Sequence, residues 1–271
     1  MKIGISLRNS GPAANRSNFI QCAQGAEAAG FDSLWVFDHV AIPPDDAEGS
    51  DGIYYDPLAS LCFVAACTER IALGTGVLVL PYRPALPTAK WIATLQALSE
   101  GRLLLGAGVG WMPAEFQALG VAREQRGQIT DKTLEFLKRC FANDLVTEND
   151  QEFLFRPRPA APPIYIGGGA DHAIERALRY GDGWIPIGKG PEAIADNISE
   201  YRDRAAELGL ATPEIVTFGQ LPLNDVDQAQ ALCATYETAG VTHLVHAVSY
   251  QHAAQFLQEV EGLQPLLAAL R

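Results

Sequence analysis

The feature that most restricts how this chain can fold is a regular alternation of short β-rich runs with longer stretches of helical periodicity. Eight such pairs follow one another along the 271 residues. In one helical stretch, the spacing that places side chains on one face of a helix is shown by Ile194, Ile198, Tyr201, Ala205 and Leu208. The expected strands are 2–7, 33–37, 71–79, 102–106, 163–166, 183–187, 214–218 and 242–247. The expected helices are 17–29, 57–68, 87–98, 128–141, 170–179, 191–208, 226–238 and 252–270.

Alternation of this kind, with several continuously apolar strands, is typical of a parallel sheet covered by helices. Eight units in a chain of this length predict a closed (β/α)8 TIM-like barrel, formed as a single domain over residues 1–271. An open doubly wound sheet is the alternative, which the count of eight disfavours. Residues 142–162 interrupt the alternation with polar residues, a short aromatic run and prolines, so we expect an inserted loop or short hairpin after the fourth helix.

Glycines mark several of the expected helix ends. Gly30 and Gly240 precede the second and eighth expected strands, and Gly181 follows an expected helix. Because glycine adopts the left-handed backbone conformation at little cost, we expect all three to cap helices in that conformation.

The composition excludes several classes of function. The 20 Lys and Arg residues against 32 Asp and Glu give a formal charge of -12, which repels a nucleic-acid backbone, so we expect no nucleic-acid partner. We find neither a signal peptide nor an uncharged apolar run long enough to span a membrane, so we expect no membrane association and a cytoplasmic location. Neither C-x-x-C nor H-E-x-x-H occurs, and we expect no metal site.

Function in such a barrel lies where the parallel strands end. Asp38 and His39 follow the second expected strand, and an adjacent carboxylate and imidazole form a plausible acid/base pair. The alternative is an aspartate that caps the loop beside a surface histidine. Gly74 and Gly76 lie inside the third expected strand, where glycine indicates either close approach of the backbone to a ligand or tight packing inside the barrel.

Two further strands end in glycine-rich segments, 106–110 and 167–169. The second segment leads directly into an expected helix, and exposed N–H groups at a helix N-terminus can hold a phosphate. The spacing within 106–110 does not match the dinucleotide-binding fingerprint. We therefore expect a generic phosphate or backbone-approach site, with ordinary turn glycines as the alternative.

Five separated segments resemble signatures of the luciferase-like monooxygenase superfamily, and they occur in the same order. They are GFDSLWVFDH (30–39), RIALGTGV (70–77), GVGW (108–111) followed by EF (115–116) and LG (119–120), PPIYIGG (162–168) and GDGW (181–184). The resemblance implies a TIM-like barrel that binds a flavin or the deazaflavin coenzyme F420. The Asp38-His39 doublet and the compact length resemble the F420-dependent oxidoreductase branch more than the flavin mononucleotide (FMN) monooxygenases.

The resemblance also implies where the cofactor would bind. Gly76 and Val77 would be joined by a non-prolyl cis peptide bond behind the cofactor ring, an arrangement that is rare elsewhere. The cofactor tail and phosphate would meet the peptides of Ala107, Gly108, Val109, Gly167, Gly168 and Gly169.

Catalytic and substrate-binding residues follow from the same resemblance. His39 would handle the proton that accompanies hydride transfer, and Asp38 would orient His39 or contact the cofactor. Trp111, Trp184 and the segment 40–55 would form a mainly apolar substrate pocket.

The implied function is hydride transfer between coenzyme F420 and a small organic substrate. The second hypothesis is an FMN-dependent two-component monooxygenase, whose partner is a separate reductase. The third is a non-catalytic flavin-binding barrel. Sugar-phosphate dehydrogenases of the superfamily carry a catalytic acid where this chain has Trp111, which argues against a sugar phosphate as substrate. A homodimer is compatible with each hypothesis.

Overall fold

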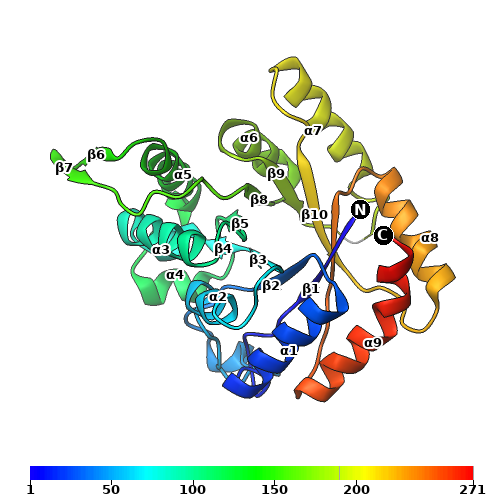
Figure 1. Cartoon of the computed structure of the whole chain (residues 1–271). Coiled ribbons are helices and arrows are strands. Elements are labelled where there is room, and N and C mark those ends of the chain that lie inside the picture. The colour runs from blue at the N-terminus through cyan, green and yellow to red at the C-terminus, as the bar shows by residue number, and fades with distance from the viewer. Residues whose placement is uncertain (189, 271) are drawn as a thin grey trace.

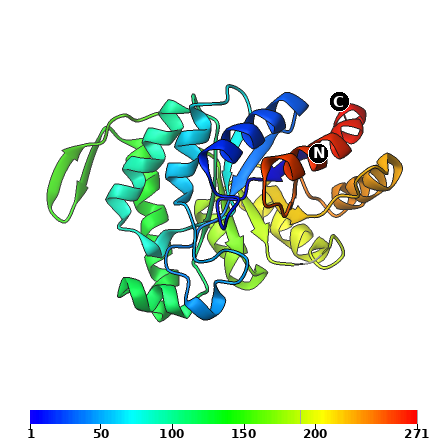
Figure 2. The ribbon, with the colours of Figure 1, turned by 90° about the horizontal axis from the view of Figure 1, so that it is seen from below.

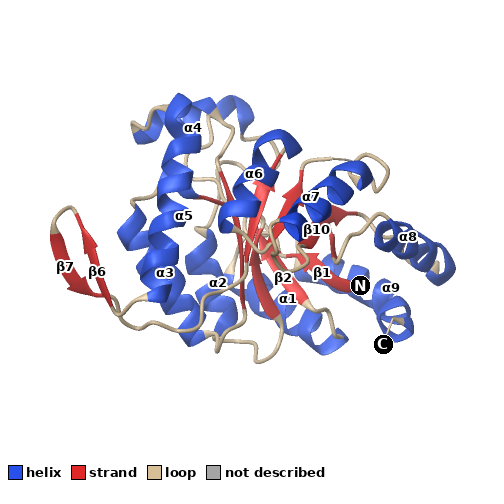
Figure 3. Ribbon diagram, turned by 90° about the horizontal axis from the view of Figure 1, so that it is seen from above, coloured by secondary structure: helices blue, strands red, loops and turns tan. Residues whose placement is uncertain are grey.

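The computed structural model describes residues 1–188 and 190–270. At its centre is a ring of parallel strands surrounded by helices (Figures 1 and 3). The strands of this ring are β1 (Lys2–Ser6), β2 (Ser33–Val36), β3 (Ala72–Thr75), β4 (Leu78–Val79), β5 (Leu103–Gly108), β8 (Ile164–Gly168), β9 (Gly183–Pro186), β10 (Glu214–Gly219) and β11 (His243–His246). Their order is β3-β2-β1-β11-β10-β9-β8-β5-β4, and β3 also pairs with β5. The sheet is therefore closed, which confirms the (β/α)8 TIM-like barrel and excludes the open sheet.

All eight expected helices are present, with ends that differ from the expected ones by a few residues. The helices are α1 (Arg16–Ala29), α2 (Pro57–Ala65), α3 (Ala85–Leu98), α4 (Pro113–Leu119), α5 (Arg126–Ala142), α6 (Ala170–Tyr180), α7 (Ala195–Glu207), α8 (Val226–Thr238) and α9 (Ala253–Ala269). The short helix α4 was not expected. Among the described residues, no helix is long and apolar enough to cross a membrane.

The insertion after the fourth expected helix is a two-stranded antiparallel hairpin of β6 (Leu145–Glu148) and β7 (Gln151–Leu154). It extends away from the barrel beside α5 (Figures 1 and 2). The turn residues Asn149 and Asp150 have φ angles of 49° and 61°, the left-handed values that a two-residue hairpin turn requires. The expected insertion within residues 142–162 is confirmed as a hairpin.

The third expected strand is not continuous. Strand β3 ends at Thr75 and β4 begins at Leu78, and the Gly76–Val77 peptide bond between them is cis, as expected. Both halves pair with β5, so they occupy one strand position of the eight-membered barrel.

Two of the three helix-capping glycines behave as expected. Gly30 and Gly240 have φ angles of 90° and 96°. The prediction for Gly181 is wrong, because its φ angle is -106°. A Cβ atom at this position would lie 3.1 Å from the carbonyl oxygen of Ile164, so close backbone packing explains this glycine better than a left-handed cap does.

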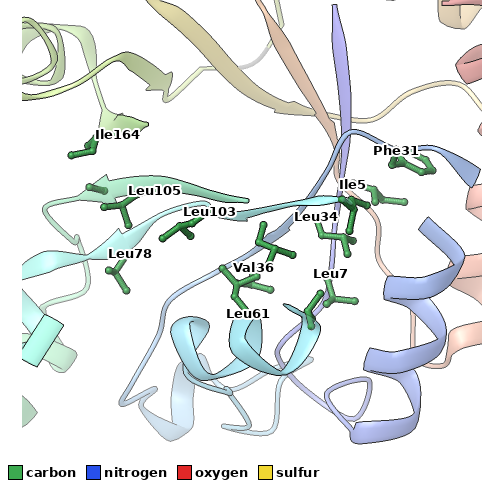
Figure 4. Close-up of a cluster of buried hydrophobic side chains, with 14 of the residues drawn as sticks. Ile5, Leu7, Phe31, Leu34, Val36, Leu61, Leu78, Leu103, Leu105 and Ile164 are labelled. Carbon is green, nitrogen blue, oxygen red and sulfur yellow. The ribbon is translucent and has the colours of Figure 1, made fainter. Parts of the chain in front are cut away.

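The barrel wall separates the two larger of the three hydrophobic clusters that the described residues form. The larger core lies between strands and helices, and Figure 4 shows part of it, with Ile5 from β1, Leu34 from β2 and Leu103 from β5. The smaller core fills the barrel interior, where Trp35 packs among Tyr165, Ile185, Val216 and Val245. A Cβ atom at Gly74 would lie 2.3 Å from Cδ2 of Trp35. Gly74 is therefore explained by tight packing inside the barrel and not by close approach of the backbone to a ligand.

Candidate active site

His39 lies at the carboxyl end of β2 and is joined to a buried carboxylate. Its Nδ1 is 3.1 Å from Oε2 of Glu115, which belongs to α4. The His39 side chain is 21% exposed, whereas that of Glu115 is 0% exposed. The imidazole is therefore held by a hydrogen bond to a buried carboxylate and is partly exposed at the mouth of the barrel.

Glu115 accepts hydrogen bonds from several donors at once. The backbone N–H groups of Val40 and Ala41 donate to its Oε1, and the hydroxyl of Tyr82 donates to Oε2 at 2.7 Å. Burial by itself would raise the pKa of Glu115, but the hydrogen bonds from His39, Val40, Tyr82 and Ala41 outweigh it and lower the pKa to about 2. The carboxylate is therefore ionised at neutral pH.

Two aromatic rings flank the imidazole of His39. The ring centroid of Tyr54 is 5.0 Å away, and that of Trp111 is 6.2 Å away and nearly perpendicular. Trp111 is 65% exposed and follows β5, so the structure brings it to the same mouth as His39. The sequence analysis predicted that Trp111 and the segment 40–55, which contains Tyr54, form the substrate pocket.

Asp38 has a different role from the one expected. Both of its carboxylate oxygens accept hydrogen bonds from the guanidinium of Arg83, at 2.6 and 2.8 Å, and Oδ2 also accepts one from the N–H of Val79. Asp38 is 5% exposed, and within the described part of the chain its carboxylate makes no hydrogen bond to His39. Glu115 therefore holds the place next to His39 that was expected for Asp38, and the alternative, that Asp38 contacts the cofactor, stays a prediction.

Arg83 connects two carboxylates, since it also donates to Asp56 at 2.7 Å. Burial opposes the charge on Arg83, but Asp38 and Asp56 raise its pKa further above the ordinary arginine value. Burial raises the pKa of Asp38, and Arg83 opposes that rise. This charged cluster fixes the ends of β2 and β4 and the start of α2 to one another, so we assign it to the support of the site.

The expected cofactor residues gather around the side chain of Val77. A Cβ atom at Gly108 would lie 2.5 Å from Cγ2 of Val77, and one at Gly167 would lie 2.6 Å from Cγ1. The structure thus brings Gly76, Val77, Gly108 and Gly167 together, from three neighbouring strand positions. Glycine is needed at 108 and 167 to make room for valine.

The remaining glycines lead from β8 into α6. Gly168 has a φ angle of 148°, and Gly169 precedes α6 in extended conformation. A Cβ atom at Gly169 would meet no atom within 4 Å, so open space adjoins the start of this helix. Ala107 is a buried member of β5 and Val109 directly follows that strand.

Trp184 is not part of the mouth. Its side chain is 1% exposed, packs in the core between barrel and helices, and donates from Nε1 to the carbonyl of Gly168 at 2.9 Å. The prediction that Trp184 lines the substrate pocket is therefore wrong. Side chains alternate along a strand, and in β9 it is Ile185 that faces the barrel interior.

Sequence reasoning assigned no role to three residues of this site, namely Glu115, Tyr82 and Arg83. Glu115 is 76 positions from His39, and Arg83 is 45 positions from Asp38, so only the fold brings them together. The one sequence signal for Glu115 was its place in a segment that resembles the superfamily. Over residues 1–188 and 190–270, no group of three or more His, Cys, Asp or Glu side chains is arranged to hold a metal ion.

Comparisons with known proteins agree with this architecture. The model of the luciferase-like monooxygenase family matches residues 1–264. An uncharacterized protein of Mycobacterium tuberculosis is 30% identical over 246 residues, which cover 84% of this chain and 83% of the relative. An F420-dependent glucose-6-phosphate dehydrogenase of Kineococcus radiotolerans is 32% identical over 222 residues, which cover 76% of this chain and 64% of the relative.

Solved structures share the fold at lower identity. An F420-dependent secondary alcohol dehydrogenase, in complex with an F420-acetone adduct, has a TM-score of 0.80 at 16% identity, with 100% of this chain and 99% of that chain covered. The oxygenating constituent of 3,6-diketocamphane monooxygenase from Pseudomonas putida, in complex with FMN, has a TM-score of 0.80 at 15% identity, with 99% and 98% covered.

Proposed function

This chain belongs to the luciferase-like monooxygenase family, and from this premise we propose that it is an oxidoreductase that uses coenzyme F420. It transfers a hydride between the deazaflavin and a small organic substrate, with secondary alcohols and ketones as the first class to test. One observation carries the proposal: His39, anchored by a buried carboxylate, opens onto the same mouth as the glycine ends of β5 and β8.

The residues at this mouth fit a flavin-type cofactor with a phosphate in its tail. Gly169 adjoins open space at the start of α6, where no side chain competes for the exposed backbone. Gly76 and Val77 would lie behind the cofactor ring, and Ala107, Gly108, Val109, Gly167, Gly168 and Gly169 would hold the tail. The F420-dependent relative from Kineococcus radiotolerans supports the deazaflavin over FMN.

When bound, a deazaflavin supplies a carbon centre that accepts or gives a hydride. The protein then has to move one proton. His39 accepts the hydroxyl proton of an alcohol at Nε2 and returns it when a ketone is reduced. Trp111 and Tyr54 flank the imidazole, orient an apolar substrate against it and exclude water.

The surroundings of His39 favour an uncharged substrate. The exposed side chains of Val40, Ile53 and Trp111 belong to the segments that lead away from β2 and β5 at the mouth. Arg83, which binds the carboxylate of Asp38 next to His39 in the sequence, is already neutralised by Asp38 and Asp56. Trp111 also stands where a sugar-phosphate dehydrogenase of the family would carry its acid, so we do not extend the activity of the Kineococcus relative to this chain.

The test of cofactor choice is a paired titration of the purified protein with coenzyme F420 and with FMN, followed by fluorescence. We expect F420 to bind at least tenfold more tightly, which corresponds to about 1.4 kcal/mol. Equal or tighter binding of FMN would overturn the deazaflavin proposal and favour the two-component monooxygenase with its separate reductase.

Two matched variants locate the phosphate. Gly169→Asp adds a negative charge in open space, and Gly169→Asn adds a neutral side chain of the same shape. Both residues are good N-caps, so neither should destabilise α6. We expect the aspartate variant to bind F420 at least tenfold more weakly than the asparagine variant. Equal affinities would move the phosphate away from this helix.

A further inference from the structure

We propose that Glu115 is a positioning residue, which holds His39 in the tautomer with its proton on Nδ1 and thereby turns Nε2 to the mouth as the proton acceptor. The inference rests on the proposed function and deepens it, because it names the group that prepares His39 for proton transfer.

The other partners of the Glu115 carboxylate are all hydrogen-bond donors. The N–H groups of Val40 and Ala41 can only donate. The Tyr82 hydroxyl keeps its proton, because burial and the Glu115 carboxylate raise its pKa, and it therefore donates as well. Three donors converge on two oxygens, which is an arrangement that stabilises a carboxylate and not a carboxylic acid.

It follows that Glu115 has no proton to give to His39. The contact of 3.1 Å between Oε2 and Nδ1 is then a hydrogen bond only if Nδ1 carries the proton. In the neutral imidazole this leaves the lone pair on Nε2. The His39 side chain is 21% exposed, so the imidazole is not sealed from a substrate.

A fixed tautomer has a defined chemical consequence. When a substrate hydroxyl transfers its proton, the O–H bond breaks and an N–H bond forms at Nε2. The imidazolium then carries a positive charge next to an ionised carboxylate of zero exposure, which stabilises it as the aspartate does in a Ser-His-Asp arrangement. The neighbouring charges of Arg83, Asp38 and Asp56 are paired with one another.

The first test needs neither cofactor nor substrate. Ring nitrogens of ¹⁵N-histidine-labelled protein are recorded by NMR, and the signals of His39 are assigned by their loss in His39→Asn. We expect a protonated Nδ1 and an unprotonated Nε2 in the wild-type protein at neutral pH. A proton on Nε2 would overturn the inference, whatever cofactor the protein binds.

The second test uses Glu115→Gln, whose amide N–H can donate to Nδ1 and so favours the opposite tautomer. We expect the proton to move to Nε2. With F420 and an alcohol that is turned over, kcat should fall roughly 10²-fold or more, while KM and F420 affinity stay within a few-fold, and the limb of the pH profile that reports His39 should shift.

Tyr82→Phe is the matched control, because it removes a hydrogen bond from the same carboxylate but leaves the carboxylate in place. It should keep the wild-type tautomer and lose less than tenfold in kcat. If both variants lose kcat alike and neither changes the tautomer, Glu115 is only structural. If the tautomer is as expected but F420 does not bind, the proposed function fails and the positioning role of Glu115 stands.

Discussion

The two ends of the barrel contain the same three kinds of side chain in different arrangements. At the mouth, Tyr82 donates to Glu115 at 2.7 Å and Glu115 contacts His39. At the opposite end, Tyr165 donates to Glu214 at 2.5 Å, and its ring centroid lies 6.1 Å from that of His243. The difference between the two clusters lies in which member is buried.

At the mouth the carboxylate is buried and the histidine is partly exposed. At the other end His243 is 1% exposed, whereas the Glu214 side chain is 37% exposed. Burial lowers the pKa of His243 to about 4, so this histidine is neutral at physiological pH. A histidine can exchange protons with a substrate only if it is the exposed member of the pair, and this singles out His39.

The largest expected effect separates the two histidines by activity. His39→Asn should lower turnover by roughly 10² to 10⁴-fold, the usual contribution of a positioned acid/base, and leave F420 affinity within a few-fold. One limb of the pH profile should disappear. His243→Asn should keep turnover within about twofold in the same steady-state assay, provided that it folds. A loss of turnover in His243→Asn and not in His39→Asn would reverse the assignment of the two clusters.

The second effect concerns stability against pH. Because the folded pKa of His243 lies below the ordinary value of about 6.5, the unfolded chain takes up this proton first as pH falls. The contribution of neutral His243 to the free energy of unfolding is complete above about pH 6.5. It is lost as the pH falls to about 4, and the total loss is about 3 kcal/mol. Urea unfolding at pH 7 and pH 4.5 measures it.

In that experiment, the stability difference between wild type and His243→Asn should shrink as pH falls, because the variant lacks the penalty. His172→Asn, which changes an exposed histidine on α6, is the control and should follow the wild type through the same range. A constant difference between wild type and His243→Asn would show that His243 is not held neutral.

The smallest effect compares the two tyrosines. Tyr82→Phe removes a hydrogen bond to a fully buried carboxylate and should lower the free energy of unfolding by about 2 kcal/mol. Tyr165→Phe should cost about 1 kcal/mol, because water reaches the exposed side of Glu214 and replaces the lost donor. Thermal or urea unfolding at pH 7 gives both values, and a larger cost for Tyr165→Phe would contradict the burial argument.

The fold could be predicted because barrel strands and helices leave periodic patterns over whole segments. The face predicted for residues 191–208 shows both the strength and the limit of such patterns: Ile194, Ile198, Tyr201 and Ala205 are buried, but Leu208 is 62% exposed, because it lies at the C-cap of α7. The seven-residue helix α4 escaped prediction, since it is too short to show a period.

From sequence patterns, residues could be assigned to the site only where they directly follow a predicted strand. His39 and the glycines could be placed at the mouth because they come at the ends of strands, and Trp111 was placed there by the family resemblance. Trp184 was assigned to the wrong side, since a one-residue shift along a strand exchanges the two faces. Glu115 could not be assigned a role, because its value depends on a hydrogen bond to a residue 76 positions away.

The packing around Val77 has a consequence for how this family can diversify. Gly108 and Gly167 cannot gain even a methyl group while Val77 keeps its two Cγ atoms between them. A mutation at one of these three sites is therefore conditional on the residues at the other two, so their fitness effects are epistatic. A lineage that places larger residues at 108 or 167 must first replace Val77 with a smaller residue. This required order leaves fewer mutational paths for the mouth of the barrel than for the β6–β7 hairpin.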